Sequence, residues 1–76
     1  SRTDAHCQQA LLLFAVSGGH AANIEPEQME AFEERLYTYF EAEQRDLVQR
    51  LSTGKKLDAE AIARLRAALT AFTEAA

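Results

Sequence analysis

Two histidines and one cysteine are the side chains of this 76-residue chain best suited to bind a metal or to act as a nucleophile. His20 lies beside Gly18 and Gly19 in a predicted loop, whereas His6 and Cys7 lie near the start of the first predicted helix. A zinc site needs three or four suitably spaced ligands, and these residues have no second cysteine and no carboxylate at such a spacing. We therefore predict no metal site, a solvated His20 and a half-buried Cys7 that acts as a small hydrophobic residue.

Carboxylates on one helix are the second group that could do chemistry. Glu30 is followed by Glu33 and Glu34, three and four residues later, and such a pair could exchange a proton with a substrate. Acid–base catalysis also needs a cleft that shifts a pKa, and nothing in the sequence predicts burial of these glutamates. We interpret them, together with Arg35 and Glu41, as a solvated helix face.

Gly54 and Lys55 faintly resemble the end of a phosphate-binding loop. The earlier glycine of that loop is missing, since Gln49 stands five positions before Gly54, and no Ser or Thr follows Lys55 and Lys56. The sequence thus offers no catalytic, cofactor-binding or metal-binding residue. A stand-alone enzyme is the least favoured interpretation, because the chain lacks a nucleophile–base pair and a metal cluster.

Composition and charge narrow the range of possible functions further. Twelve acidic and eight basic residues give a net charge of −4, which argues against nucleic acid as a partner because binding to phosphates relies on a basic face. The longest apolar run, residues 11–16, is far shorter than the roughly 20 residues of a membrane span, so we expect no membrane insertion. One proline, three glycines and abundant helix-forming residues predict an all-α fold, with one domain over residues 1–76.

The apolar run at residues 11–16 is the centre of the predicted fold. A short apolar run is compatible with a strand or a helix. Asp4 as a helix cap, and Gly18 and Gly19 as residues with positive φ, favour a helix over residues 5–17. Because this helix is apolar nearly all round, we expect it to be covered on more than one side.

Three further helices are predicted. Pro26 starts the second helix, in which Met29, Phe32, Leu36 and Tyr39 form an apolar stripe with Phe40 beside it and Tyr37 more exposed. A third helix, or a bent continuation of the second, covers residues 44–52. Asp58 caps a last helix over residues 59–73. The predicted core consists of Phe14, Phe32, Leu36, Leu51, Leu65 and Leu69.

The joint spacing of these apolar positions resembles a known family. The positions are Leu11-Leu12-Leu13-Phe14-Ala15, Gly19, Ile24, Phe32-Glu33-x-x-Leu36-x-x-Tyr39, Leu47, Leu51, Leu57, Glu60, Leu65, Ala68-Leu69 and Phe72. They are similar to the C-terminal end of the α subunit of rotary F-type ATP synthases, with its pattern L-(Y/F)-A-G-x-x-G-(Y/L)-L-D-x-I-P, F-E-x-x-L and L-x-x-E-x-x-x-L-x-x-A-L-x-x-F. The resemblance covers the chain from about Gln9 to Phe72.

Departures from the pattern indicate a divergent α subunit. Val16 replaces a usual glycine, His20-Ala21-Ala22 replaces an aromatic residue or leucine followed by Leu-Asp, Pro26 lies one position late, and Arg45 replaces a frequent proline. The family's nucleotide-binding motifs lie upstream of this segment. No catalytic or cofactor-binding residue is therefore carried over.

The resemblance implies a small bundle of about four helices, of the left-handed superhelix type, at the C-terminal end of a larger subunit. Its implied role is non-catalytic: contact with the β and γ subunits and a collar around the rotating shaft, in ATP synthesis or hydrolysis coupled to ion transport. The implied location is the cytoplasmic, peripheral part of a membrane-associated complex.

An independent helical adaptor is the alternative function, in which a groove left by the first helix binds a partner helix. Either interpretation predicts an apolar face. We expect Leu12 or Leu13 to stay partly exposed, or to be covered by a second copy of the chain in a homodimer.

Overall fold

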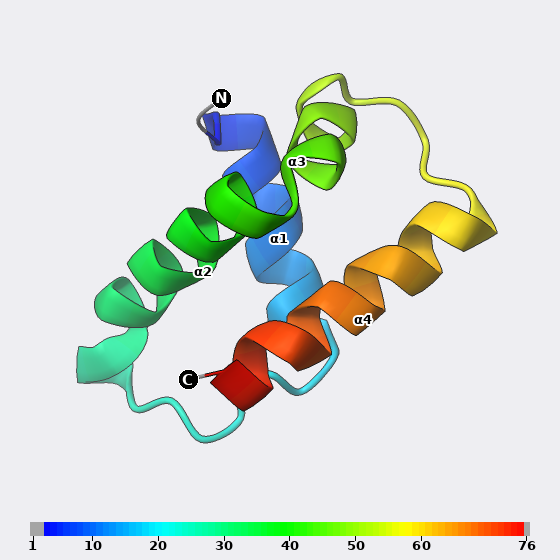
Figure 1. The fold of residues 1–76 in the computed structure, drawn as a ribbon. Helices are drawn as coiled ribbons and strands as arrows, with labels where there is room; N and C mark the ends of the chain where they lie inside the picture. The colour runs from blue at the N-terminus through cyan, green and yellow to red at the C-terminus, as the bar shows by residue number, and fades with distance from the viewer. Residues whose placement is uncertain (1–2, 76) are drawn as a thin grey trace.

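The computed structural model describes residues 3–75, which form an all-α bundle (Figure 1). Within this range, four α-helices and one short 3₁₀ turn follow each other along the chain: α1 (Ala5–Ser17), η1 (Pro26–Gln28), α2 (Met29–Glu43), α3 (Arg45–Ser52) and α4 (Ala59–Ala75). The predicted fold class and helix number are confirmed. Gln44, with φ −133° and ψ 50°, separates α2 from α3, so α3 is a helix in its own right.

The ends of α1 lie at the predicted residues. At its start, the Asp4 carboxylate accepts a hydrogen bond from the Cys7 backbone N–H at 2.8 Å, which satisfies one of the free N–H groups of the first turn. At its end, Gly18 has an ordinary φ of −86° and Gly19 has a φ of +82°. Only the second glycine therefore supplies the left-handed conformation that we expected from both.

The other helices begin at local signals in the sequence. Pro26 is the first residue of the turn η1, and the fixed φ of proline suits this position. The turn leads directly into α2. Gly54, with φ +71°, follows the end of α3. Asp58 caps α4, because its carboxylate accepts a hydrogen bond from the Ala61 backbone N–H at 2.8 Å. This helix continues to Ala75, two residues beyond the predicted end.

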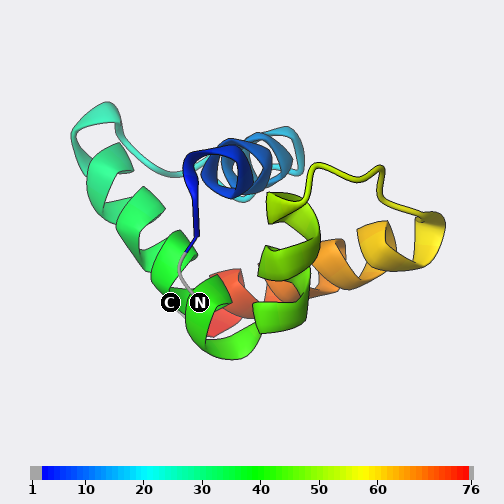
Figure 2. The same ribbon diagram turned by 90° about the horizontal axis from the view of Figure 1, so that it is seen from above.

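Helices α2, α3 and α4 cover one side of α1. In Figure 1, α1 lies behind the others, and in Figure 2, which views the molecule from above, it lies along the far edge. Cys7, Leu11 and Ala15 recur every four residues and are completely buried. Leu13 and Val16 remain 67% and 52% exposed. The exposure of Leu13 confirms the expectation that Leu12 or Leu13 stays partly exposed, while Ala10, Leu12 and Phe14 beside the buried stripe pack against the core.

Side chains from all four α-helices form one core. Its members are Cys7, Leu11, Ala15, Phe32, Leu36, Phe40, Leu47, Val48, Leu51, Leu65, Ala68, Leu69 and Phe72. Five of the six predicted core residues are among them. The sixth, Phe14, is only half-buried, because it lies about 100° around α1 from the buried stripe that ends at Ala15.

The buried stripe of α2 also differs in detail from the prediction. Phe32, Leu36 and Phe40 are buried at steps of four residues, and Phe40 is completely enclosed. Tyr39, which we expected in the stripe, is half-buried at its edge, and Tyr37 is half-buried as well. Steps of four residues bring Phe32, Leu36 and Phe40 to one side of the helix. Tyr39, one position before Phe40, lies about 100° around the helix from that side.

Candidate functional site

The two histidines do not form a joint site. His6 is exposed in the first turn of α1, and His20 follows the end of that helix. A helix of 13 residues is about 20 Å long at 1.5 Å per residue, which separates the two rings too far for a shared metal. Within residues 3–75, no group of three or more His, Cys, Asp or Glu side chains is placed to hold a metal ion.

His20 has a structural partner, contrary to the prediction of a solvated loop residue. Its Nδ1 atom lies 3.0 Å from the Thr73 hydroxyl oxygen, although 53 residues separate the two in the sequence. The ring also lies close to Gly18, where an added Cβ would meet its Cδ2 atom at 3.0 Å. A side chain at position 18 would therefore displace His20, so this glycine is needed for the close approach.

The carboxylates on α2 differ in exposure and in contacts. Glu30 and Glu34 are exposed, as predicted. Glu33 is half-buried and accepts a hydrogen bond from the Tyr37 hydroxyl at 3.3 Å. Burial, with the Glu33 charge and hydrogen bond as further causes, raises the pKa of Tyr37 to about 12. Glu33 therefore has a structural contact rather than the solvated position we expected.

Sequence reasoning missed the link between Thr3 and Glu41. The Glu41 carboxylate accepts hydrogen bonds from both the backbone N–H and the hydroxyl of Thr3, at 2.7 and 2.9 Å. Thr3 is buried and Glu41 is half-buried, so Glu41 is not part of a solvated face. No local pattern could reveal this pair, because its members are 38 positions apart in the sequence.

Cys7 is more deeply buried than predicted. Its exposed fraction is 0%, and the thiol is free. Burial raises the pKa of the Cys7 thiol, so the reactive thiolate is disfavoured. The prediction that Cys7 packs as a small hydrophobic residue is confirmed, but the residue belongs to the core and not to its margin.

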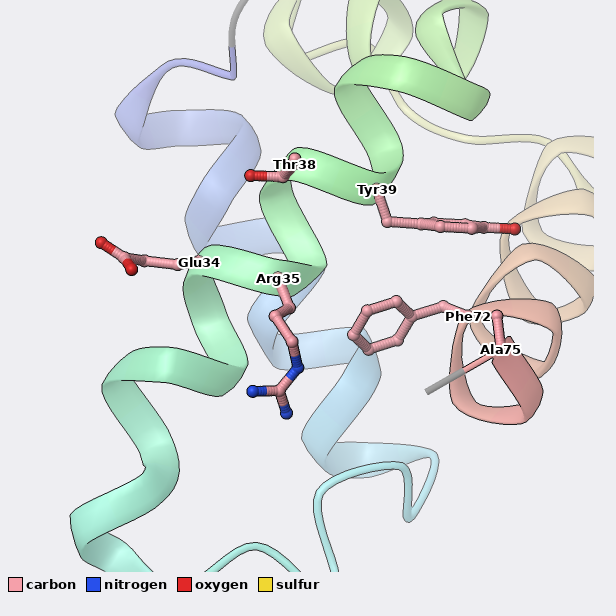
Figure 3. Close-up of a pocket in the computed structure, with 6 residues that line it drawn as sticks. All are labelled: Glu34, Arg35, Thr38, Tyr39, Phe72 and Ala75. Carbon is pink, nitrogen blue, oxygen red and sulfur yellow. The ribbon is translucent and has the colours of Figure 1, made fainter.

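A mainly apolar hollow of about 480 Å³ lies between α2 and the end of α4 (Figure 3). Its walls are Glu34, Arg35, Thr38, Tyr39, Phe72 and Ala75. The ring centres of Tyr39 and Phe72 are 5.4 Å apart. In Figure 3 the Phe72 ring projects from α4 toward α2, whereas Glu34 and Thr38 point away from α4.

This hollow could hold an apolar side chain of another protein. Its volume is in the range of ligand pockets, and aromatic rings line it. Its walls contain no histidine, cysteine or serine. The described part of the protein also has no helix long and apolar enough to cross a membrane.

Comparisons with known proteins agree on one family. The family model "ATP synthase alpha/beta chain, C terminal domain" matches residues 3–72. ATP synthase subunit alpha of Aquifex aeolicus (strain VF5) is 34% identical over 67 residues, which is 88% of this chain. ATP synthase subunit alpha of Streptococcus pyogenes serotype M49 (strain NZ131) is 37% identical over the same share of the chain. The match covers 13% of each relative's length, and no solved structure matches significantly.

Proposed function

Because this chain belongs to the family of the C-terminal domains of ATP synthase alpha and beta subunits, we propose that it acts as the non-catalytic C-terminal domain of an ATP synthase α subunit. The single observation that carries the proposal is the match over nearly the whole domain, from residue 3 to residue 72. The rest of the subunit, with its nucleotide-binding machinery, precedes this domain.

The contacts of the polar side chains support a non-catalytic role. Asp4 and Asp58 each cap the helix that follows them. Glu41 binds Thr3 and His20 contacts Thr73, and these two contacts join distant parts of the fold. Catalytic groups, in contrast, lie in a cleft where they can reach a substrate. The chemistry-bearing residues of this protein thus stabilise the fold.

The proposed role is mechanical. The domain contacts the β and γ subunits of the complex and contributes to the collar around the rotating shaft, during ATP synthesis or hydrolysis coupled to ion transport. The exposed Leu13 and Val16 support a neighbour on α1, because apolar side chains grouped on a surface commonly mark a contact site. The complex is bound to the membrane through other subunits, and this domain stays in the cytoplasm.

A chimera tests this proposal. In the α subunit of Streptococcus pyogenes ATP synthase, the aligned C-terminal segment is replaced by this chain, and the subunit is produced together with its β and γ subunits. We expect the complex to assemble, as measured by size-exclusion chromatography, and to retain ATP hydrolysis. A second chimera with Leu13→Asp and Val16→Asp should assemble less well, because a buried charge has no partner there.

A misfolded chimera has to be distinguished from one that does not assemble. Circular dichroism and limited proteolysis of the isolated chimeric α subunit show whether its C-terminal helices are folded. A folded chimera that does not associate with β and γ contradicts the proposal.

An independent adaptor is the second candidate function, and the hollow between α2 and α4 is the observation that favours it. This hollow lies in a different place from the expected groove, which was predicted beside the first helix. The walls of the hollow belong to α2 and α4 and include no residue of α1. A folded chimera that does not assemble, combined with binding of an amphipathic helix that is weakened by Tyr39→Ala, would favour the adaptor.

A further inference from the structure

A groove between α3 and α4 gathers much of the positive charge of the protein. It consists of two hollows, of about 570 and 260 Å³, which share Asp46 and Arg64 in their walls. We call this the cationic groove and define it by four basic residues: Arg45, Arg50, Lys55 and Arg64. All four side chains are exposed.

The distribution of charge is uneven. Four of the eight basic residues of the protein line the groove, against two acidic ones, Glu43 and Asp46. The groove thus carries a net charge of +2 in a protein of net charge −4, and the remaining residues carry −6. Such a separation of charge attracts an acidic partner to one place on the surface.

Most of these basic side chains lack a partner within the described structure. Arg45, Lys55 and Arg64 make no hydrogen bond or ion pair through their side chains with any of residues 3–75. Arg50 contacts Asp58 at 3.5 Å, and the side chains of this pair are 45% and 63% exposed. An exposed ion pair of this kind is weak, so Arg50 can exchange Asp58 for another carboxylate.

We propose that the cationic groove binds an acidic protein segment that carries at least two carboxylates. Three of the four cations are arginines, whose planar guanidinium groups match carboxylates with two parallel hydrogen bonds. A single carboxylate occupies only one of the two hollows, whereas an extended acidic segment can place one in each, on either side of Arg64. The groove is formed by α3, α4, the segment between them and the end of α2, and the proposal is independent of the proposed function.

A nucleic acid fits the groove less well than an acidic segment. Its closely spaced phosphates would meet Glu43 and Asp46 inside the groove and the acidic side chains on the rest of the surface. Binding of nucleic acids relies on an extended basic face, and this groove is short and flanked by negative charge. A short protein segment ends before it reaches those flanks.

The test uses a capped seven-residue peptide with four glutamates, and a control peptide with glutamine at the same positions. Both are titrated into the isotope-labelled protein, and binding is followed by NMR chemical shifts. We expect the glutamate peptide to shift the amide signals of α3 and of α4 around Arg64. We also expect its affinity to fall with added salt, because exposed charges are screened. The glutamine peptide should leave these signals unchanged.

A pair of matched variants then locates the site. Arg64→Glu and Arg66→Glu change the net charge equally, and both residues are exposed on α4. They point about 200° apart around the helix, and Arg66 lines a different hollow beside His20. We expect Arg64→Glu to weaken binding by at least about tenfold and Arg66→Glu by less than about threefold. Thermal melts verify that both variants fold, and Lys55→Gln provides a second substitution in the groove.

Three results would overturn the proposal. Equal weakening by the two variants would indicate general attraction to the whole protein instead of a site. If millimolar glutamate peptide caused no shifts, or if the glutamine peptide caused equal shifts, the groove would not recognise the carboxylates of an acidic segment. Tighter binding of a short single-stranded DNA through Arg64 would assign the groove to nucleic acid.

Discussion

The Thr73 hydroxyl accepts a hydrogen bond from His20. Its oxygen lies 2.9 Å from the Leu69 carbonyl, to which it donates its only hydrogen. The contact at 3.0 Å between this oxygen and His20 Nδ1 must then use the nitrogen as the donor. A neutral His20 therefore carries its proton on Nδ1, and a doubly protonated ring keeps the same bond.

This bond should stabilise the fold by a measurable amount. His20→Asn retains an N–H donor near the position of Nδ1, whereas His20→Ala removes it. We expect the free energy of unfolding of His20→Ala, measured with urea, to be about 0.5–1.5 kcal/mol lower than that of His20→Asn. In a Thr73→Val background the difference should vanish. A difference that persists there would mean that Thr73 is not the acceptor.

Two leucine substitutions should separate core from surface. Leu65 is completely buried, and Leu13 is 67% exposed. Leu65→Ala should lower the free energy of unfolding by about 2–5 kcal/mol, because it leaves a cavity in the core. Leu13→Ala should change it by less than about 0.5 kcal/mol. Thermal or urea unfolding measures both, and similar losses for the two variants would contradict the described packing.

Stability should decrease in alkaline solution because of Tyr37. In the unfolded state this phenol loses its proton near pH 10, but in the folded state burial raises its pKa to about 12. Between these two pH values the unfolded state binds fewer protons, so the free energy of unfolding falls as pH rises. Because Tyr37 is only half-buried, we expect a loss of about 1–2 kcal/mol.

Tyr37→Phe should remove this pH dependence. Both proteins are compared in a Cys7→Ala background, because burial also raises the pKa of the Cys7 thiol and acts in the same direction. Urea midpoints and the phenolate absorbance are recorded across the alkaline range. An equal slope for the two proteins would contradict the assignment to Tyr37.

The isolated chain should neither hydrolyse ATP nor bind it tightly. A nucleotide site needs backbone amides of a glycine-rich loop, a lysine and a magnesium ligand in fixed geometry. Lys55 and Lys56 are exposed beside the single Gly54, and the net charge of −4 opposes a polyphosphate. Calorimetric titration with magnesium-ATP at physiological salt should show at most weak, salt-sensitive binding. Saturable micromolar binding would contradict the assignment to a non-catalytic domain.

The exposed face of α1 should promote self-association of the isolated protein at high concentration. Leu13 and Val16 are both exposed, and Leu12 next to them is half-buried. We expect sedimentation velocity to show a dimer whose population increases with concentration. Leu13→Glu combined with Val16→Glu should restore the monomer, because the charges stay solvated only when this face is free. A dimer that persists in the double variant would form through another surface.

Local signals made the helix boundaries predictable. Asp4, Pro26 and Asp58 act on backbone groups within three residues of themselves, so their effect can be inferred from the sequence alone. Periodic apolar residues likewise identified five of the thirteen core residues, since a stripe such as Leu65 and Leu69 has one side on which to be buried.

Two of the missed features depend on contacts between distant segments. His20 finds Thr73 only after α1 and α4 have packed, and Thr3 finds Glu41 only after α2 has folded back along α1. Periodicity also cannot decide between neighbouring apolar residues at the edge of a stripe. Phe40 lies in the core, whereas Tyr39, its neighbour on α2, is half-buried.

The double hydrogen bond between Thr3 and Glu41 has a mechanical consequence. Both donors of Thr3, the backbone N–H and the hydroxyl, bind one carboxylate near the end of α2. A pull on the backbone at Thr3 is therefore shared between the covalent chain that leads into α1 and the two hydrogen bonds to α2. Part of the load thus reaches α2 directly, without passing along α1.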